Sequence, residues 1–222
     1  MGPPSQLSRW GTMGPMDTAV ELVEIYLRLN GYLTLSEWQI QTLSDSGRWQ
    51  TLTDVDIFGL RLPGDVYLAD VHDTQRRESM RMTGELLMLE EDTADVIIGE
   101  VKEGEAVFNP AVAHHETLHT ALHRIGWLYG EGDLEKIIGD LGEHGVCYTP
   151  ARGGGTVRTR LVAFGQAPQL TINTVPIGKI LERLTTIFET HDELLRSMKF
   201  SNPAAATLNL LHKTGFRISR GS

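Results

Sequence analysis

The segment DVIIGEVK, residues 95–102, constrains the fold of the chain more than any other segment. Its apolar residues form one short run without helical spacing, which predicts a buried strand. Glu100 and Lys102 end this run, and because side chains alternate along a strand, both lie on the same face. A buried strand that ends in such a pair carries either an ordinary surface ion pair or part of a metal-dependent site.

The patterns on either side of this segment predict an α/β fold. Apolar residues at helical spacing predict helices at 17–30, 109–130, 134–142, 176–198 and 202–216, several of which begin at a proline or a capping residue. Alternating or continuous apolar runs predict strands at 32–41, 51–63, 95–102, 144–150 and 156–165. This order of elements predicts a mixed sheet flanked by helices.

Changes in composition divide the chain into three parts. Residues 1–16 are rich in Gly, Pro, Ser and Met, and we expect a flexible N-terminus. Residues 17–165 contain the predicted sheet, with a charged and partly helical insertion at 64–94. Residues 166–222 are expected to form a helical extension that packs on the same domain. A chain of 222 residues is long enough for one sizeable core.

Composition also limits the class of function. Cys147 is the single cysteine, which excludes an intramolecular disulfide and a cysteine-rich zinc site and favours a cytoplasmic location. The apolar runs are too short to span a membrane, and the N-terminus has no apolar segment typical of a secretory signal, so we expect no membrane association. The net charge of −9 argues against a protein that holds nucleic acid through its overall field, although it is compatible with a local basic patch.

A second carboxylate belongs to the strand that precedes the insertion. Asp56 lies within it, and Asp54, two residues earlier on the same face, either substitutes for Asp56 or flanks it. If this strand pairs with the strand after the insertion, Asp56 and Glu100 converge. Two carboxylates with open positions for water suit Mg²⁺ or Mn²⁺, which activates a bound water and polarises a phosphoryl oxygen. Lys102 is then placed to orient that water or to stabilise charge on phosphorus.

The order of a first helix, TDVDIFG, an insertion and IIGEVK resembles the PD-(D/E)XK nuclease superfamily, in particular its resolvase-like and Mrr-like branches. The resemblance covers about residues 17–165 and implies a restriction-endonuclease-like αβββαβ core. It also implies that a glutamate of the first helix joins the metal site, and Glu21 stands at that position, with Glu24 as the alternative. The proline that often precedes the first acidic residue of the family is absent, and the insertion is long for these branches.

The resemblance implies a nuclease that uses Mg²⁺ or Mn²⁺ to hydrolyse phosphodiester bonds of DNA, in bacterial defence or repair. Asp56 and Glu100 would hold the metal, Lys102 would position the water, and Glu21 would assist. The acidic net charge predicts that affinity for DNA comes from a homodimer or a protein partner. The alternative is a module that kept the fold, lost the chemistry and binds a protein or a nucleic acid. The choice between DNA and RNA stays open.

A rival motif lies in the predicted helix at 109–130. Residues 115–119 read HETLH, the H-E-x-x-H pattern in which two histidines one turn apart bind zinc and the glutamate acts as a base. The extended pattern of the metzincins fails, because Leu122 and Ile125 occupy its Gly and His positions. Glu135 and Glu143 are the candidates for a third ligand. A zinc peptidase is therefore a minor alternative, and a histidine-rich helix face is the simpler interpretation.

Two clusters of arginines are candidates for contact with nucleic acid. One lies in the insertion and contains Arg76, Arg77 and Arg81. The other surrounds the glycine-rich ARGGGTVRTR and contains Arg152, Arg158 and Arg160. Backbone N–H groups of the glycine loop would approach phosphates closely. A solvated hairpin loop is the alternative for the second cluster.

Overall fold

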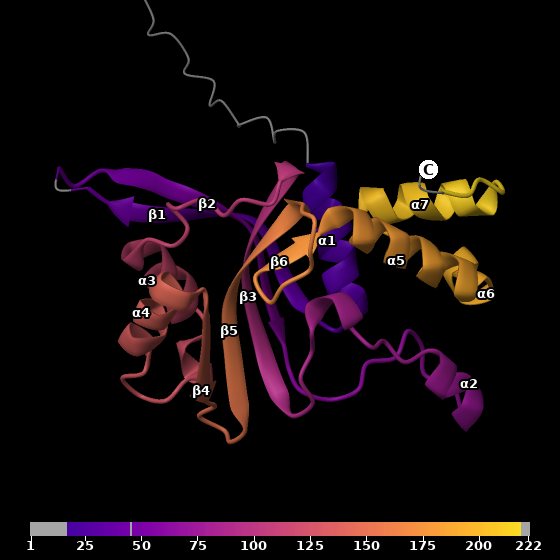
Figure 1. Ribbon diagram of the computed structural model, residues 1–222, viewed down its shortest axis with the longest axis horizontal. Helices are drawn as coiled ribbons and strands as arrows, with labels where there is room; N and C mark the ends of the chain where they lie inside the picture. The colour runs from indigo at the N-terminus through magenta and orange to yellow at the C-terminus, as the bar shows by residue number, and fades with distance from the viewer. Residues whose placement is uncertain (1–16, 45, 219–222) are drawn as a thin grey trace, which may run out of the picture.

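The computed structural model describes residues 17–44 and 46–218, so the segment predicted to be flexible, 1–16, lies outside the described residues. Within the described ranges the chain forms a curled, mixed six-stranded sheet with helices on both faces (Figure 1). The α/β class and most of the predicted elements are therefore confirmed. In the same part of the chain, no helix has the length and apolar character needed to cross a membrane.

The first half of the chain contains one helix and three antiparallel strands. They are α1 (Thr18–Leu29), β1 (Leu33–Leu43), β2 (Trp49–Arg61) and β3 (Thr93–Glu105). Asp17 caps α1, because its carboxylate accepts a hydrogen bond from the backbone N–H of Ala19. The insertion between β2 and β3 holds α2 (Thr74–Ser79) and the 3₁₀ turn η1 (Glu85–Leu87), which confirms its partly helical character.

The second half begins with a crossover that returns the chain to the same end of the sheet. The crossover contains α3 (His115–His123), η2 (Gly126–Leu128), α4 (Leu134–His144) and β4 (Val146–Pro150), and β5 (Thr156–Gln166) then pairs with β3 in parallel. The remaining elements are β6 (Thr174–Pro176), α5 (Ile177–Thr190), α6 (Asp192–Ser197) and α7 (Pro203–Lys213). The strand order is β1-β2-β3-β5-β4, with β6 on β5.

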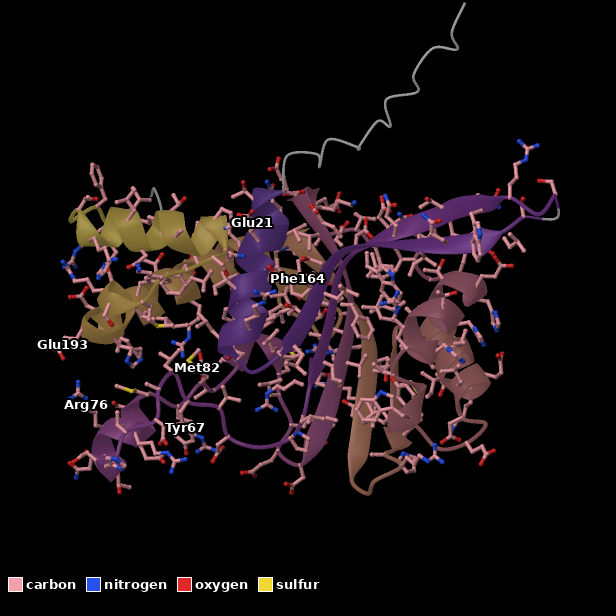
Figure 2. The ribbon with its side chains drawn as sticks, turned by 180° about the vertical axis from the view of Figure 1, so that it is seen from behind. Glu21, Tyr67, Arg76, Met82, Phe164 and Glu193 are labelled. Carbon is pink, nitrogen blue, oxygen red and sulfur yellow. The ribbon has the colours of Figure 1, made fainter. Side chains whose placement is uncertain are left out.

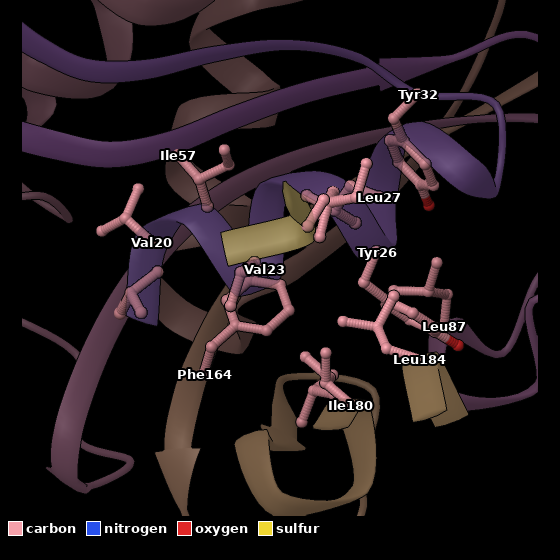
Figure 3. Close-up of a cluster of buried hydrophobic side chains, with 14 of the residues drawn as sticks. Val20, Val23, Tyr26, Leu27, Tyr32, Ile57, Leu87, Phe164, Ile180 and Leu184 are labelled. Carbon is pink, nitrogen blue, oxygen red and sulfur yellow. The ribbon is translucent and has the colours of Figure 1, made fainter. Parts of the chain in front are cut away.

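The sheet separates two hydrophobic cores. On one face α1, α5 and α7 cover Ile57, Phe164 and their neighbours (Figure 3), and on the other face α3 and α4 cover Phe58 and Ile98. Gly99 marks the closest approach within the sheet, because a Cβ at this position would lie 2.9 Å from the Phe164 ring and would overlap Ile57. A side chain at this position would push β3 away from β2. The residue after it, Glu100, is therefore held close to the neighbouring strand.

Two predicted helices differ from the structure, and one short strand was missed. The helix predicted at 109–130 contains only α3 and η2, because residues 109–114 form successive turns whose N–H groups bond carbonyls three residues earlier. The helix predicted at 176–198 is divided at His191 into α5 and α6. Asp192, at the start of α6, binds Arg196 of the same helix and His212 of α7. β6 was not predicted, since three residues are too few for a periodic pattern.

Candidate functional site

Asp56 and Glu100 converge at the point where β2 leaves β3. The last pair of their antiparallel register is Ile57 with Gly99, and Asp56 and Glu100 are the next residues of the two strands. The carboxylate of Asp56 reaches across and accepts a hydrogen bond of 2.7 Å from the backbone N–H of Val101. Asp56 and Glu100, the two carboxylates expected to converge, therefore lie on neighbouring strands just beyond the last pair of the register.

Glu100 and Lys102 form an ion pair on the same face of β3. The Glu100 side chain is only 2% exposed, whereas that of Lys102 is 46% exposed, so the pair points from the interior toward solvent. Lys102 donates to one carboxylate oxygen, Oε1. The other oxygen, Oε2, is buried and forms no hydrogen bond with any residue that the structure describes. A buried carboxylate oxygen without a donor is costly, and such groups call for a specific explanation.

The electrostatics of the three residues are coupled. Burial raises the pKa of Glu100, and the negative charge of Asp56 raises it further, against the opposing effect of Lys102. Burial also raises the pKa of Asp56, although the hydrogen bond from Val101 and the charge of Lys102 oppose the shift. The hydrogen bond to Glu100 raises the pKa of Lys102. The site therefore holds two carboxylates whose charge is unfavourable in the free protein and one ammonium group that stays charged at neutral pH.

Asp17, which caps α1, is a fourth charged residue of this region and was not among the predicted site residues. Its charge raises the pKa of both Asp56 and Lys102, which places the N-terminus of α1 beside the site. One oxygen of its carboxylate is used in capping α1. The charge of Asp54 also raises the pKa of Asp56. Asp54 therefore flanks Asp56, which is one of the two interpretations that the sequence left open.

Glu21 and Glu24 are engaged elsewhere. Glu21 is buried and accepts a hydrogen bond of 2.9 Å from the backbone N–H of Ala204, at the start of α7 (Figure 2). Glu24 accepts hydrogen bonds from Arg28, Thr34 and Ser36. Both carboxylates thus have donors that tie α1 to its neighbours. The structure does not bring either of them into the group formed by Asp56 and Glu100.

Glu100 and Lys102 line a shallow pocket of about 440 Å³ that opens onto solvent, and Asp56 is not part of its lining. Besides Glu100 and Lys102, the pocket is lined by residues 103–105 of β3 and by 107–110 in the loop before α3. The described residues contain no group of three or more His, Cys, Asp or Glu side chains arranged around one metal position. The donors present are two carboxylates, and oxygen donors of this kind suit a hard divalent cation that keeps several waters. The unpartnered Oε2 of Glu100 fits such an ion.

Two of the predicted nucleic-acid contacts are wrong. Arg158 and Arg160 are 1% and 0% exposed and both bind the buried carboxylate of Asp95, at 2.6 and 2.8 Å. Their remaining N–H groups donate to backbone carbonyls, including those of Leu87 and Ile172. These arginines connect β5 to β3 and to the insertion, and they have no surface from which to reach a phosphate.

The other predicted arginines are exposed but lie away from the carboxylate pair. Arg76 forms an ion pair of 3.3 Å with Glu193 (Figure 2), and Arg77 lies over the ring of Tyr67. Arg81 pairs with Asp65. Arg152, in the glycine loop, lines a pocket of about 420 Å³ at the edge of the sheet where β3 begins, whereas Glu100 lies near the opposite end of this strand.

The histidines of HETLH form a column along α3. The rings of His115 and His119 stack with centroids 6.1 Å apart, and His119 and His123 repeat the arrangement at 5.9 Å. His115 shares a hydrogen bond of 2.8 Å with Glu135 of α4. Stacked rings of this kind lie along the helix instead of converging on one point. The zinc interpretation therefore gains no support from the arrangement of the described residues.

Neither the models of protein families, nor curated protein sequences, nor solved structures gave a significant match to this chain. The assignment of a function therefore depends on the geometry and the chemistry of the carboxylate site.

Proposed function

We propose that the chain is a nuclease of the PD-(D/E)XK kind, which uses Mg²⁺ or Mn²⁺ to hydrolyse phosphodiester bonds of DNA. The observation that carries the proposal is the proximity of Asp56 to Glu100 and Lys102, where one buried oxygen of Glu100 has no donor among the described residues. The order of α1, three antiparallel strands, a helical crossover and a strand parallel to β3 supports it. This order is the one that the resemblance in sequence implies.

Each side chain has a separate part in this proposal. Asp56 and Glu100 supply the oxygen ligands, and the N–H of Val101 fixes the orientation of the Asp56 carboxylate. A divalent cation bound there would activate a water molecule and polarise the phosphoryl oxygen. Lys102 is charged at neutral pH, because its hydrogen bond with Glu100 raises its pKa. It therefore acts as a hydrogen-bond donor to the water or to the phosphate, and not as a general base.

A cleavage assay tests the proposal. Supercoiled plasmid and linear duplex DNA are incubated with the protein and Mg²⁺ or Mn²⁺, and a folded RNA is tested in parallel. We expect Glu100→Ala and Lys102→Ala to lower the rate by about 10³-fold each, as the loss of a group that stabilises transition-state charge does. Glu91→Ala and Lys136→Ala, which change exposed residues outside the site, serve as matched controls. Full activity of both site variants would overturn the proposal.

Two other functions predict different results in the same preparation. A module that has lost the chemistry would bind no divalent cation and cleave none of the substrates. A zinc peptidase would purify with stoichiometric zinc, and His119→Ala would remove it. Metal analysis of the purified wild-type protein, together with the cleavage assay, therefore separates the three.

A further inference from the structure

The strands β1 and β2 continue past the sheet as a two-stranded ribbon that projects sideways above α3 (Figure 1). Pairing between β2 and β3 covers only Ile57–Arg61, so the residues of β2 before Asp56 pair with β1 alone. The ribbon thus begins at the candidate metal site. Any molecule that is bound at Asp56 and Glu100 and extends along this direction lies against it.

The ribbon has an anchored base and an exposed outer part. At the base, Ile40 and Val55 are fully buried in the core that contains α3 and α4. The register between the strands shifts after Ile40, and from this point the ribbon leaves the core. In the outer part, Leu43 and Trp49 face each other as a cross-strand pair and are 55% and 71% exposed. The base fixes the direction of the ribbon, and its outer part is free to contact a partner.

The ribbon carries, over residues 38–53, polar side chains that can bind nucleic acid although its net charge is close to zero. Residues 38–53 carry one Arg and one Asp, whereas the whole chain has a net charge of −9. Glutamine, threonine and serine make up most of the remaining polar side chains of this range, and they donate and accept hydrogen bonds with phosphates and base edges. The formal charges of this range cancel, so it repels a phosphate backbone less than the acidic chain as a whole does.

Two arginines at the ribbon are also available to bind phosphates. Most of the exposed arginines elsewhere pair with a carboxylate, as Arg76 does with Glu193 and Arg196 with Asp192. Arg48, at the tip of the ribbon, forms no ion pair with any residue that the structure describes. Arg124, which follows α3, lies over the ring of Trp38 at the base of the ribbon, 4.2 Å from its centroid. Since neither guanidinium forms an ion pair within residues 17–44 and 46–218, both can attract phosphates.

We infer that this ribbon is a DNA-binding arm that contacts the duplex on one side of the cleaved bond, an inference that rests on the proposed function. A two-stranded ribbon fits the major groove of B-form DNA, whereas the major groove of an RNA duplex is too narrow. From Asp56 to Trp49 the strand spans about 23 Å at ~3.3 Å per residue. At ~3.4 Å per base pair the tip therefore reaches DNA about 7 base pairs from the scissile phosphate.

Binding to DNA without cleavage tests the inference. The affinity of the full chain for a 30-base-pair duplex is measured by fluorescence anisotropy in Ca²⁺, with an RNA duplex in parallel. We expect Arg48→Ala and Trp49→Ala each to weaken DNA binding about 5- to 10-fold, and Arg48→Ala to reduce the salt slope by about 1. Trp127→Ala is the matched control, because Trp127 is a similarly exposed tryptophan that lies in the pocket near the start of β3. Arg48→Ala and Trp49→Ala change exposed side chains, and thermal unfolding verifies that both variants are folded.

Four outcomes separate this inference from the proposed function. Weaker binding of the two ribbon variants, with the wild-type cleavage rate at saturating DNA, supports it. Wild-type affinity and cleavage in both variants overturn the inference alone. A wild-type protein that neither binds nor cleaves DNA overturns the proposed function and the inference with it. Ribbon variants that change the oligomeric state while keeping their DNA affinity identify the ribbon as an interface between copies of the chain and also overturn the inference.

Discussion

Asp95 and Glu100 are two carboxylates of the same strand, and both are 2% exposed, yet their surroundings differ completely. Both oxygens of Asp95 have donors: Tyr32, Arg158 and Arg160 all bind this carboxylate. Glu100 has a single donor, Lys102, and its second oxygen has none among the described residues. Burial is thus equal, and the number of donors is what distinguishes the two residues.

The difference in donors shifts the pKa values of Asp95 and Glu100 in opposite directions. Burial raises the pKa of Asp95, but the charges and hydrogen bonds of Arg160 and Arg158 outweigh burial and hold the pKa below its usual range. At Glu100 burial prevails over Lys102 and the pKa is raised. Asp95 therefore belongs to a structural network that is complete in the free protein. Glu100 belongs to a site that an additional cation would complete.

The largest expected effect comes from breaking the complete network. Asp95→Ala leaves buried Arg160 without its counter-charge and Arg158 with only the partly exposed Glu90, and we expect a loss of about 3–5 kcal/mol in the free energy of unfolding. Denaturant unfolding followed by circular dichroism measures it. Glu90→Ala, which removes a partly exposed partner of Arg158, is the control and should cost under ~1 kcal/mol. An equal loss in the free energy of unfolding for the two variants would show that Asp95 is not the essential counter-charge of the network.

The incomplete site should show a dependence on pH that the complete network lacks. Because the pKa values of Glu100 and Asp56 are raised, protons compete with a metal at pH values above the usual carboxyl range of about 4. We expect the affinity for Mn²⁺ to fall as the pH decreases through the raised pKa values, by up to about tenfold per pH unit for each proton displaced. Calorimetric titration between pH 8 and pH 5, a range of about three units chosen around these values, measures it. An affinity that is constant over this range would contradict the raised pKa values.

A smaller effect is expected on the stability of the protein without metal. A carboxyl group with a raised pKa in the folded state stabilises the fold when it is protonated, and this contribution is lost as the pH rises through the raised pKa. Glu100→Gln imitates the protonated group at every pH. We expect it to raise the Tm at pH 7.5 by about 2–4 °C, the shift that a gain of ~1 kcal/mol produces in a chain of this size. The gain should disappear as the pH falls below the usual carboxyl range. A lower Tm at pH 7.5 would show that the ion pair with Lys102 outweighs burial.

Asp17 should give the smallest effect. Asn is as good a helix cap as Asp, so Asp17→Asn keeps α1 and removes only the charge beside the site. We expect the affinity for Mn²⁺ to fall about 2- to 5-fold, since a single charge at this distance is largely screened by water. Asp73→Asn, which changes the corresponding cap of α2, is the matched control and should leave the affinity unchanged. A loss of more than about 10³-fold would instead identify Asp17 as a direct ligand.

Sequence patterns predicted the parts of the structure that depend on local periodicity. The strands around Asp56 and the segment 95–102 follow from alternation and apolar runs, and the antiparallel register then brings Asp56 to Glu100. The partly helical insertion follows from its composition, and the mixed sheet follows from the order of the elements. The candidate site could therefore be predicted from residues that are 44 positions apart, 56 and 100, in the sequence.

What the patterns missed depends on contacts between distant residues. Arg158 and Arg160 are charged residues in an alternating strand, which usually indicates a solvated face, but Asp95 binds both of them from the neighbouring strand. The resemblance implies that Glu21 is a site residue, whereas its carboxylate accepts a hydrogen bond from the N–H of Ala204 at the start of α7, 183 positions away. Asp17 is recognisable as a helix cap from local sequence, whereas its proximity to Asp56 depends on how α1 packs on the sheet.

Calorimetric titration of Mg²⁺ and Mn²⁺ into the wild-type protein, Asp56→Ala and Glu100→Ala tests most directly that the incomplete carboxylate pair holds a divalent cation. Glu91→Ala serves as the control, and thermal unfolding verifies that every variant is folded. We expect at least one of the two cations to bind to the wild type and to the control, and both site variants to lose this binding. Absence of binding in the wild type, or unchanged binding in both site variants, would contradict this expectation.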